Sequence, residues 1–304
     1  MNKENLLNLA RELECSVAYN EPLSAHTTFK VGGPCTAMVE VGSEEALCSL
    51  IRAANNLSIR YYILGNGSNV LFEDKGFDGI VFKTDKTLND IYMINSTTIY
   101  AQAGCSLIKL CRFALEHNLS GLEFAYGIPG TVGGAIYMNA GAYNGEIKDV
   151  ISSATAIRKD GTKHTIQKKD LNLSYRHSCF EITGDIIASG IFVLTPANYD
   201  DIQDKMVELM GKRRSKQPLE FPSAGSTFKR PAGFFAGKLI EDCGLKGYSV
   251  GGAQVSEKHC GFVINKGGAT CEDILTLIKN VQNIVKEKTG QFLECEVRIV
   301  PYSE

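Results

Sequence analysis

Two polar residues have types and neighbours that suit chemistry on an anionic substrate. Arg176 lies between Tyr175 and His177 before an apolar stretch, and a permanently charged guanidinium there suits a carboxylate, a phosphate or a developing oxyanion. Ser226 follows Gly225 in a segment bracketed by prolines, so its hydroxyl could be held rigidly, although the segment is not a G-x-S-x-G nucleophile elbow. Each also has an ordinary alternative, a surface ion pair for the arginine and a turn for the serine.

The end of the chain alternates charged and apolar residues over 292–300. A strand there would have two faces, with Cys295, Val297 and Ile299 on one and Glu294, Glu296 and Arg298 on the other. The charged face is either exposed to solvent or the wall of a cleft. Periodicity does not distinguish these two interpretations.

A loop rich in glycine and asparagine lies between two apolar runs at 63–72. Glycine and asparagine tolerate positive φ, so successive N–H groups can converge into an anion-binding nest. Those residues are Gly65, Asn66, Gly67, Ser68 and Asn69. A plain hairpin turn is the alternative. A Rossmann site is excluded because the G-x-G-x-x-G spacing is missing and the next segment resembles a strand.

A second glycine-rich segment, 127–146, is otherwise mostly apolar. Many glycines among apolar residues suit a backbone that passes close to a large flat ligand. A flexible solvated loop is the alternative, but Ile128, Val132 and Ile136 make the segment hydrophobic for such a loop. We therefore favour ligand contact.

Composition and charge exclude several classes of protein. The chain has 304 residues, 44% hydrophobic and 22% charged, with a formal net charge of −2. These values are typical of a globular protein of about two domains and leave no overall field to attract nucleic acid or acidic membranes. The N-terminal segment has an acid-containing amphipathic pattern, so we do not expect it to be a signal peptide, and no apolar run approaches the ~18 residues of a membrane span. We expect neither a nucleic-acid nor a membrane partner.

The cysteines indicate the redox compartment. Ten occur without a Cys-x-x-Cys pair or a histidine at ligand spacing, so we expect no metal site. The pattern favours free, mostly buried thiols in a reducing cytoplasm.

The elements that must position these residues form two α+β regions. Apolar periodicity predicts helices near 6–13 and at 44–56, 106–117, 200–214, 233–242 and 271–288. Strand-like runs lie at 36–41, 60–65, 79–83, 97–103, 186–195, 251–255, 261–265 and 292–300. The texture changes near Asp200, which predicts a region 1–199 with subdomains of about 1–58 and 59–199, and a region 200–304.

Six motifs occur in an order and spacing that match one protein family. They are TFKVGGP (28–34), LGNGSN (64–69), GIPGTVGGA (127–135), SYR (174–176), AGSTFKRP (224–231) and EVRI (296–299). Together they resemble the UDP-N-acetylenolpyruvoylglucosamine reductase family from about Pro22 to Ile299. The length and the direct run from Pro231 into the next helix resemble the short form of the family.

The resemblance implies a flavoprotein. Region 1–199 would be an FAD-binding domain of the vanillyl-alcohol-oxidase (PCMH) type, and 200–304 a C-terminal α+β substrate-binding domain. The implied reaction is NADPH-dependent reduction of the enolpyruvyl group of UDP-N-acetylenolpyruvoylglucosamine to UDP-N-acetylmuramate, in peptidoglycan precursor synthesis. FAD would bind non-covalently, with NADPH and the sugar nucleotide as the small-molecule partners of an expected monomer.

The resemblance also implies roles for residues. Ser226 would donate a proton, Arg176 would stabilise the enolic intermediate and Glu296 would assist. The pyrophosphate of FAD would lie at Gly65–Asn69, and the flavin at Gly127, Ile128, Pro129, Gly130, Thr131, Gly134 and Ala135. Substrate contacts would come from Tyr175, Arg214, Lys229 and Arg230. Cys260 and Cys295 depart from the small residues expected at their positions and replace no catalytic group.

The chemistry of the residues agrees with these roles. Reducing an enol ether attached to a carboxylate builds negative charge on that carboxylate, which an arginine and an acid can stabilise. A fixed hydroxyl can supply the proton, and a cofactor must carry the hydride because no side chain does. Two other functions stay open: a flavin oxidase or dehydrogenase of the same fold acting on a sugar or alcohol, and a non-catalytic nucleotide-sugar-binding module.

Overall fold

Helices and short strands are interspersed along the chain in the computed structural model, which describes residues 2–303. The α-helices are α1 (Asn2–Glu12), α2 (Glu44–Asn56), α3 (Leu107–Glu116), α4 (Val132–Tyr137), α5 (Ile147–Val150), α6 (Phe180–Thr183), α7 (Tyr199–Lys216), α8 (Ala236–Asp242) and α9 (Cys271–Thr289). Short 3-10 helices are η1 (Leu23–His26), η2 (Glu123–Ala125) and η3 (Lys168–Asp170). The predicted α+β class is confirmed.

The strands are short and belong to several sheets. They are β1 (Ser16–Tyr19), β2 (Cys35–Glu40), β3 (Tyr61–Leu64), β4 (Val70–Phe72), β5 (Phe77–Lys83), β6 (Ile91–Asn95), β7 (Thr98–Gln102), β8 (Leu119–Ser120), β9 (Gly141–Ala142), β10 (Gly145–Glu146), β11 (Ile151–Ile157), β12 (Lys163–Gln167), β13 (Ile186–Val193), β14 (Thr195–Pro196), β15 (Ser249–Val250), β16 (Ala253–Val255), β17 (Val263–Asn265) and β18 (Arg298–Val300).

The described chain forms two compact units. The large unit comprises residues 2–19, 37–66 and 79–212, and the small unit comprises 20–36, 67–78 and 213–303. The small unit therefore includes two segments from the N-terminal half of the chain. One crossing between the units falls between Asn66 and Gly67, inside the first glycine-rich loop.

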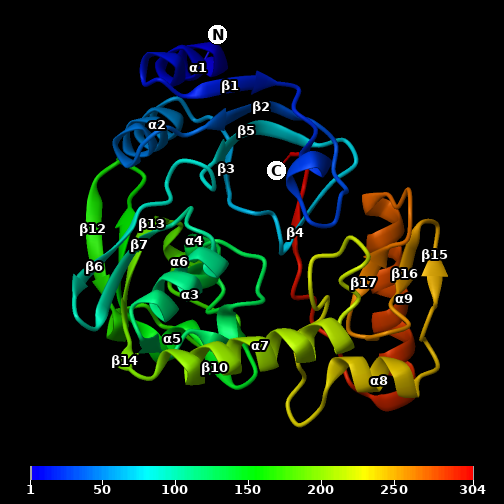
Figure 1. Cartoon of the computed structure of the whole chain (residues 1–304). Helices are drawn as coiled ribbons and strands as arrows, with labels where there is room; N and C mark the ends of the chain where they lie inside the picture. Colours follow the sequence, from blue (N-terminus) through cyan, green and yellow to red (C-terminus); the bar gives the residue numbers. More distant parts are fainter. Residues whose placement is uncertain (1, 304) are drawn as a thin grey trace. The chain divides into compact units, whose positions relative to one another are not determined.

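One sheet of the large unit has the strand order β1-β2-β5-β3 and is covered by α1 and α2 (Figure 1). Helix α2 begins after Ser43, whose side chain accepts a hydrogen bond from Ala46 N, as is usual for an N-cap serine. Its apolar stripe, including Leu47, Leu50 and Ile51, is fully buried in the core between the helices and the sheet. This burial explains why the helical period predicted α2 with its observed bounds.

The second sheet of the large unit has the order β12-β11-β13-β7-β6. Helices α3 and α4 lie against it, with α4 packed on β13 and β7 (Figure 1). Their common core includes Leu110, Val132, Ile136 and Phe192, all buried. The sheet and this core hold the second glycine-rich segment in place.

The small unit is built around α9. The helix packs on β15 and β16 of the three-stranded sheet β15-β16-β17, and α8 packs beside it. Thr270 and Asp273 form a capping box at its start, where the Asp74 carboxylate also accepts hydrogen bonds from Cys271 N and Glu272 N at 2.7 and 3.1 Å. These contacts tie the 67–78 segment to the C-terminal part of the unit.

The predicted strand over 292–300 is wrong in length and in its buried face. Only β18 (Arg298–Val300) is a strand, and Ile299 is 45% exposed while Leu293, Val297 and Val300 are buried. Residues 294–296 pair antiparallel with 227–229, whereas 298–300 pair in parallel with β4. The change of partner resets which side faces the core, so a single alternation does not hold.

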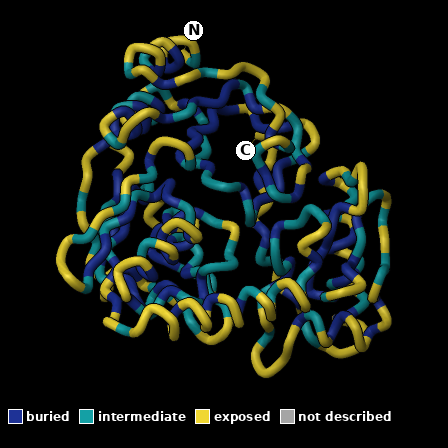
Figure 2. Tube along the Cα trace, in the orientation of Figure 1, coloured by how far each residue is buried: buried dark blue, intermediate teal, exposed yellow. Residues whose placement is uncertain are grey.

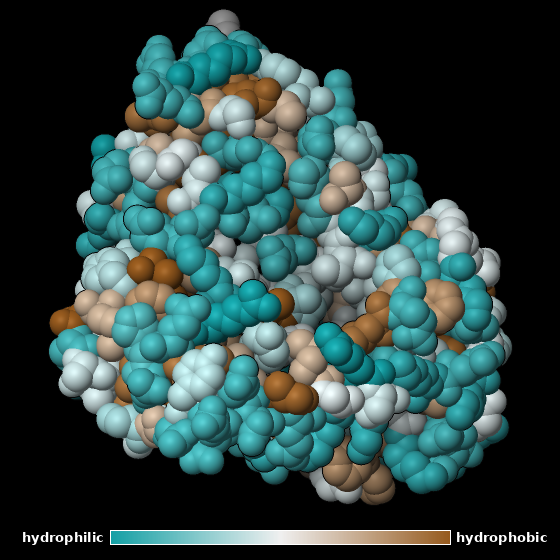
Figure 3. All heavy atoms as spheres, viewed as in Figure 1, coloured by the Kyte–Doolittle hydropathy of each residue, from teal (hydrophilic) through white to brown (hydrophobic). Residues whose placement is uncertain are grey.

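Buried and exposed residues separate clearly within each unit (Figure 2). All ten cysteines are free thiols; nine are buried and Cys295 is half-buried. The face drawn in Figure 3 is mostly hydrophilic, with small separate apolar patches. In the described range 2–303, no helix is both long enough and apolar enough to cross a membrane.

Candidate functional site

The first glycine-rich loop, Gly65–Asn69, is not a hairpin turn. Strand β3, which precedes it, pairs in parallel with β5, whereas β4, which follows it, pairs in parallel with β18. A hairpin would need β3 and β4 to pair with each other. The loop therefore joins two different sheets, and the hairpin alternative is excluded.

The polar backbone groups of this loop are used unequally. Three of its five carbonyls accept hydrogen bonds from the protein: Gly65 O from Lys83 Nζ (2.5 Å), Gly67 O from Thr28 N (3.1 Å) and Asn69 O from Arg298 N (3.0 Å). In contrast, the backbone N–H groups of residues 66–69 have no acceptor anywhere in the described chain. Successive backbone N–H groups without a protein acceptor can all donate to one anion, so they suit a phosphate. The chemistry of the loop therefore fits the pyrophosphate of a dinucleotide.

Two glycines of the loop leave no room for a side chain. A Cβ on Gly67, where φ is +61°, would lie 2.3 Å from the backbone oxygen of His26. A Cβ on Gly65 would lie 2.5 Å from Thr131 Oγ1, and Asn66 Nδ2 is 3.5 Å from Pro129 O. The large unit therefore brings Gly65 and Asn66 directly against the second predicted cofactor segment.

That second segment, Gly127–Ala135, is anchored to the core by buried residues at Thr131, Val132 and Ala135. Thr131 is buried and caps α4, with its Oγ1 accepting a hydrogen bond from Gly134 N at 3.4 Å. Gly133 N donates to Ala103 O at 2.8 Å, and a Cβ on Gly133 would lie 2.9 Å from the Cβ of Ala103. Gly134 is exposed and has space around it. The flexible-loop alternative is therefore excluded.

Arg176 lies at the tip of a tight turn in the large unit. Ser174 and His177 pair through two backbone hydrogen bonds of 3.2 and 3.1 Å, with Tyr175 and Arg176 between them. Arg176 has φ +54°, a conformation that residues with a side chain seldom adopt and that clusters at functional sites. Its Cζ lies 4.9 Å from the centre of the Tyr175 ring, and its Nη2 donates to Gly141 O at 3.3 Å.

A buried asparagine holds this turn. Asn139 has no exposed surface, and its Nδ2 donates to Ser174 O at 2.9 Å and to Glu146 Oε2 at 2.5 Å. Its Oδ1 accepts from Lys148 N at 2.8 Å. Each hydrogen-bonding atom of the amide is therefore used, and one of them fixes the residue two positions before Arg176.

Ser226 and Glu296 lie on paired segments of the small unit. Thr227, which follows Ser226, is fully buried and donates from its backbone N to Gly261 O at 2.8 Å. Its carbonyl accepts from Glu296 N at 2.8 Å. The Glu296 side chain carries a buried oxygen, Oε2. The structure thus places Ser226 and Glu296, which are far apart in sequence, on adjoining backbone segments.

The first glycine-rich loop ends on the same segment. Asn69 Nδ2 donates to the backbone oxygen of Glu296 at 3.2 Å, and Arg298 N donates to Asn69 O. Arg176 and Tyr175 belong to the large unit, whereas Ser226 and Glu296 belong to the small unit.

The predicted substrate-binding residues differ in their surroundings. Lys229 Nζ pairs with Glu294 Oε1 at 2.6 Å, and Arg230 Cζ lies 4.6 Å from the centre of the Phe235 ring. Arg214 is exposed near the end of α7, and the Tyr175 side chain is 48% exposed. Lys229, Arg230 and Arg214 belong to the small unit.

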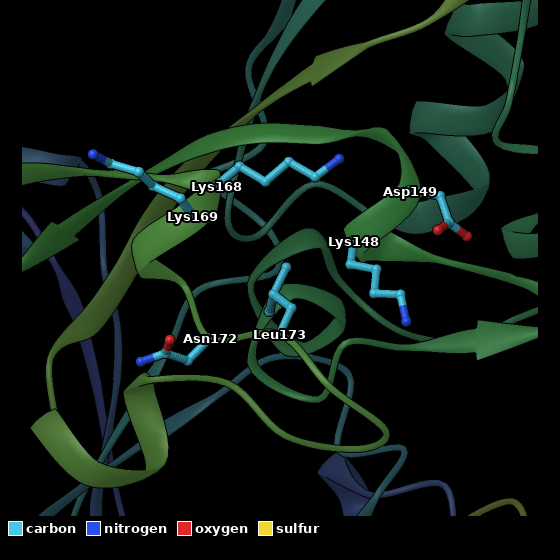
Figure 4. Close-up of a pocket in the computed structure, with 6 residues that line it drawn as sticks. All are labelled: Lys148, Asp149, Lys168, Lys169, Asn172 and Leu173. Carbon is cyan, nitrogen blue, oxygen red and sulfur yellow. The ribbon is translucent and has the colours of Figure 1, made fainter.

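A pocket of about 440 Å³ in the large unit contains none of the predicted site residues. Its lining residues are Lys148, Asp149, Lys168, Lys169, Asn172 and Leu173 (Figure 4). Lys169 points away from the other two lysines in Figure 4, and Lys148 pairs with Glu146. The cationic groups do not converge on one point, so this pocket is a poor anion site.

Comparison with known proteins relates this chain to one family. A model described as "FAD binding domain" matches residues 35–167, and one described as "UDP-N-acetylenolpyruvoylglucosamine reductase, C-terminal domain" matches 217–300. A protein of Clostridium botulinum (strain 657 / Type Ba4) with the name UDP-N-acetylenolpyruvoylglucosamine reductase is 53% identical, over 94% of this chain and 92% of its own length. One of the same name from Agathobacter rectalis is 48% identical, over 99% of both chains. The chain belongs to the UDP-N-acetylenolpyruvoylglucosamine reductase family.

A solved structure supports the same assignment. The UDP-N-acetylenolpyruvylglucosamine reductase of Thermus caldophilus is 32% identical with a TM-score of 0.80, covering 94% of this chain and 99% of its own. As a member of the UDP-N-acetylenolpyruvoylglucosamine reductase family, the protein is an FAD-dependent oxidoreductase. The predictions of family, fold class, enzyme class and cofactor are confirmed.

Two polar residues that contact the motifs of this reductase were missed by the sequence analysis. Lys83 donates to Gly65 O, and Asn139 donates to Ser174 O. The only local signals were a lysine ending the apolar run GIVFK and an asparagine inside the run IYMNAG. Neither signal indicates which residue accepts the hydrogen bond, because both hydrogen bonds join segments that are distant in sequence.

Proposed function

We propose that Ser226, Arg176 and Glu296 carry out the reaction of the family in this chain. That reaction is the NADPH-dependent reduction of the enolpyruvyl group of UDP-N-acetylenolpyruvoylglucosamine to UDP-N-acetylmuramate, in peptidoglycan precursor synthesis. The observation that most supports the residue roles is the 2.8 Å hydrogen bond from Glu296 N to Thr227 O. It holds a hydroxyl and a carboxylate on adjacent backbone segments.

The roles follow from where charge develops. FAD, when bound, would supply hydride-transfer chemistry between NADPH and the carbon β to the substrate carboxylate. Negative charge then builds on the carboxylate as an enolate, which the Arg176 guanidinium stabilises with the help of Glu296. The Ser226 hydroxyl gives the proton that the α carbon needs. Arg176 suits its role because its charge is permanent and its donors match two carboxylate oxygens.

FAD binding is assigned to the two glycine-rich segments. The available N–H groups of residues 66–69 hold the pyrophosphate, and Gly127–Ala135 lines the flavin. The close approach of Gly65 to Thr131 supports the use of both segments by one ligand. We also propose that residues 1–199 form the FAD-binding region, in subdomains of about 1–58 and 59–199, and residues 200–304 the substrate-binding domain.

Binding of the sugar nucleotide is assigned to Tyr175, Arg214, Lys229 and Arg230, with its diphosphate at Arg214. Three of these are cations, which suits a diphosphate. Lys229 is held by Glu294 and Arg230 lies over Phe235, so both charged groups are oriented before a ligand arrives. The protein acts as a monomer in the cytoplasm, where free thiols persist.

The purified protein tests this function in two steps. A flavin absorbance spectrum after purification is expected, and its absence would favour a non-catalytic sugar-nucleotide-binding module. Oxidation of NADPH that depends on the enolpyruvyl sugar is then expected, with UDP-N-acetylmuramate as the product. Rapid oxygen consumption with a sugar or alcohol, and none with the enolpyruvyl compound, would indicate a different flavin oxidase.

A further inference from the structure

Lys83 is a buried lysine beside the first glycine-rich loop. It is the last residue of β5 and its side chain is 5% exposed. Its Nζ lies 2.7 Å from Asp85 Oδ1 and 2.5 Å from the backbone oxygen of Gly65. Burial lowers the pKa of Lys83, and the Asp85 carboxylate opposes that shift. Burying an ammonium group is costly unless the group is paired and hydrogen-bonded, as Lys83 is here.

Fold stability alone does not explain these contacts. A buried ion pair is often no more stabilising than apolar residues of the same volume. The backbone here is already joined by strand pairing, since Leu64 lies opposite Lys83 and Thr84 N donates to Leu64 O at 3.2 Å. The hydrogen bond to Gly65 O therefore adds something other than strand register.

The added effect is the orientation of one peptide group. The peptide between Gly65 and Asn66 is planar and trans, so its C=O and N–H point in opposite directions. Because Lys83 holds the Gly65 carbonyl, the N–H of Asn66 must point away from Lys83. That N–H is the first of the four that have no acceptor within residues 2–303.

We propose that Lys83 is a positioning residue for the FAD pyrophosphate, holding the Gly65–Asn66 peptide so that the Asn66 N–H donates to a phosphate oxygen. This inference rests on the proposed placement of the pyrophosphate at Gly65–Asn69. Lys83 and Asp85 together are formally neutral, so the effect is one of orientation more than of added charge. The proposal predicts that FAD binding depends on the hydrogen bond that Lys83 donates to Gly65 O, and not on the net charge of Lys83 and Asp85.

The first test measures flavin affinity in apoprotein. Lys83→Met keeps the length of the side chain and removes the donor. Apoprotein from which flavin has been removed is titrated with FAD and with riboflavin, which has no phosphate. FAD affinity is expected to fall about 10–100-fold, the range for losing a hydrogen bond to a charged group, while riboflavin affinity stays unchanged. A parallel loss for both ligands, or no loss for FAD, would overturn the proposal.

A matched control separates position from charge. Lys86→Met removes the same charge three residues away, at a side chain that is 63% exposed and pairs with Glu40. FAD affinity is expected to change less than about 2-fold in this variant, because exposed ion pairs are weak. An equal loss of FAD affinity in both variants would indicate a general charge effect and contradict the positioning role.

A double variant addresses folding. Lys83→Met leaves the Asp85 carboxylate without the ammonium, which can destabilise the apoprotein or repel a phosphate. Lys83→Met with Asp85→Asn removes both charges, and its apoprotein melting temperature is expected to return close to that of the wild type. Its FAD affinity is expected to stay low. Recovery of FAD affinity in the double variant would show that the carboxylate, and not the lost carbonyl anchor, caused the defect.

A loop variant distinguishes this inference from the proposed function. Gly67→Ala places a Cβ within 2.3 Å of His26 O, so it is expected to distort the loop and weaken FAD binding. Unchanged FAD affinity in Gly67→Ala would show that the pyrophosphate lies elsewhere, and the proposed site would fail. A lower FAD affinity in Gly67→Ala together with an unchanged FAD affinity in Lys83→Met would reject only the role of Lys83.

Discussion

Asn69 Nδ2 donates a hydrogen bond to the backbone oxygen of Glu296 across 3.2 Å, and the carbonyl of Asn69 accepts one from Arg298 N at 3.0 Å. The last residue of the proposed pyrophosphate loop is therefore hydrogen-bonded through its side chain and its backbone to the segment that carries Glu296, which is proposed to assist Arg176. A shift of either segment moves the other, because both hydrogen bonds involve the backbone. If the loop holds the pyrophosphate as proposed, we expect cofactor binding to affect the geometry at Glu296 through this contact.

Ser226→Ala tests the proton donor. Bleaching of the flavin by NADPH is expected to keep its wild-type rate, whereas recovery of flavin absorbance with the sugar substrate slows about 10²–10⁴-fold, the usual contribution of a positioned general acid. Stopped-flow absorbance measures the two half-reactions separately. Ser223→Ala, in the same segment, serves as the control. Equal slowing of both half-reactions would mean that Ser226 has a structural role.

Asn139→Asp tests the support of the Arg176 turn. The carboxylate would face Ser174 O and Glu146 Oε2 without a proton to donate. We expect the sugar-dependent half-reaction to slow at least about 10-fold at pH 8, with FAD content unchanged. The variant Arg176→Lys is expected to show the same two effects. The nearby Glu146 raises the pKa of a new carboxyl group, so the variant should recover relative to the wild type as the pH falls and the acid becomes a donor.

Asn55→Asp is the matched control for that experiment. Asn55 Nδ2 also donates to two oxygens, Ile51 O at 2.8 Å and the Tyr61 hydroxyl at 3.2 Å, but it lies in α2. A loss of melting temperature without a selective effect on the sugar-dependent half-reaction is expected. If both variants slow both half-reactions equally, Asn139 contributes only stability.

Arg214→Ala tests the diphosphate assignment. Arg214 is exposed, so the melting temperature should change little, whereas the Kd for the sugar nucleotide should rise about 10-fold or more if the guanidinium binds phosphate. Calorimetric titration and thermal unfolding measure the two effects. Lys212→Ala, two residues earlier in α7 at a side chain paired with Glu208, is the control. A stability loss of about 0.3–1 kcal/mol with unchanged affinity would indicate a helix C-terminus effect instead.

The buried cysteines predict a pH dependence of stability. Burial raises the pKa of Cys35 and Cys105 to about 11 and that of Cys271 to about 12, from a usual value of 9.0. Their contribution to stability is complete below pH 9, because the thiol is then protonated in both states. It is lost as the pH rises from 9 towards 11–12, where only the unfolded thiol ionises freely.

Two measurements check this expectation. Urea unfolding with a reductant present should show a free energy of unfolding that falls between pH 9 and 10.5. At pH 8 a thiol reagent should label the native protein slowly, and should label all ten cysteines after unfolding. Fast labelling of Cys35, Cys105 or Cys271 in the native protein would contradict their burial.

Local patterns in the sequence were enough to predict the long helices. Helix α2 has the predicted bounds, and α9 ends one residue later than predicted, at Thr289. Their signals are local: an apolar stripe with a period of 3.6, a cap residue such as Ser43, and a glycine at the C-terminal end, Gly290. The motifs at 64–69, 127–135 and 224–231 likewise lie within a few consecutive residues, so their resemblance to the family was visible in the sequence.

Tertiary contacts decided the rest. The parallel pairing of β4 with β18 joins Val70 to Arg298 and ends the alternation that the sequence suggested for 292–300. The membership of 20–36 and 67–78 in the small unit has no local signal. The partners of Lys83 and Asn139 are also remote in sequence. Periodicity indicates which side of an element is buried. Buried polar groups and parallel strands take their hydrogen-bond partners from segments distant in sequence, and only the folded chain specifies those segments.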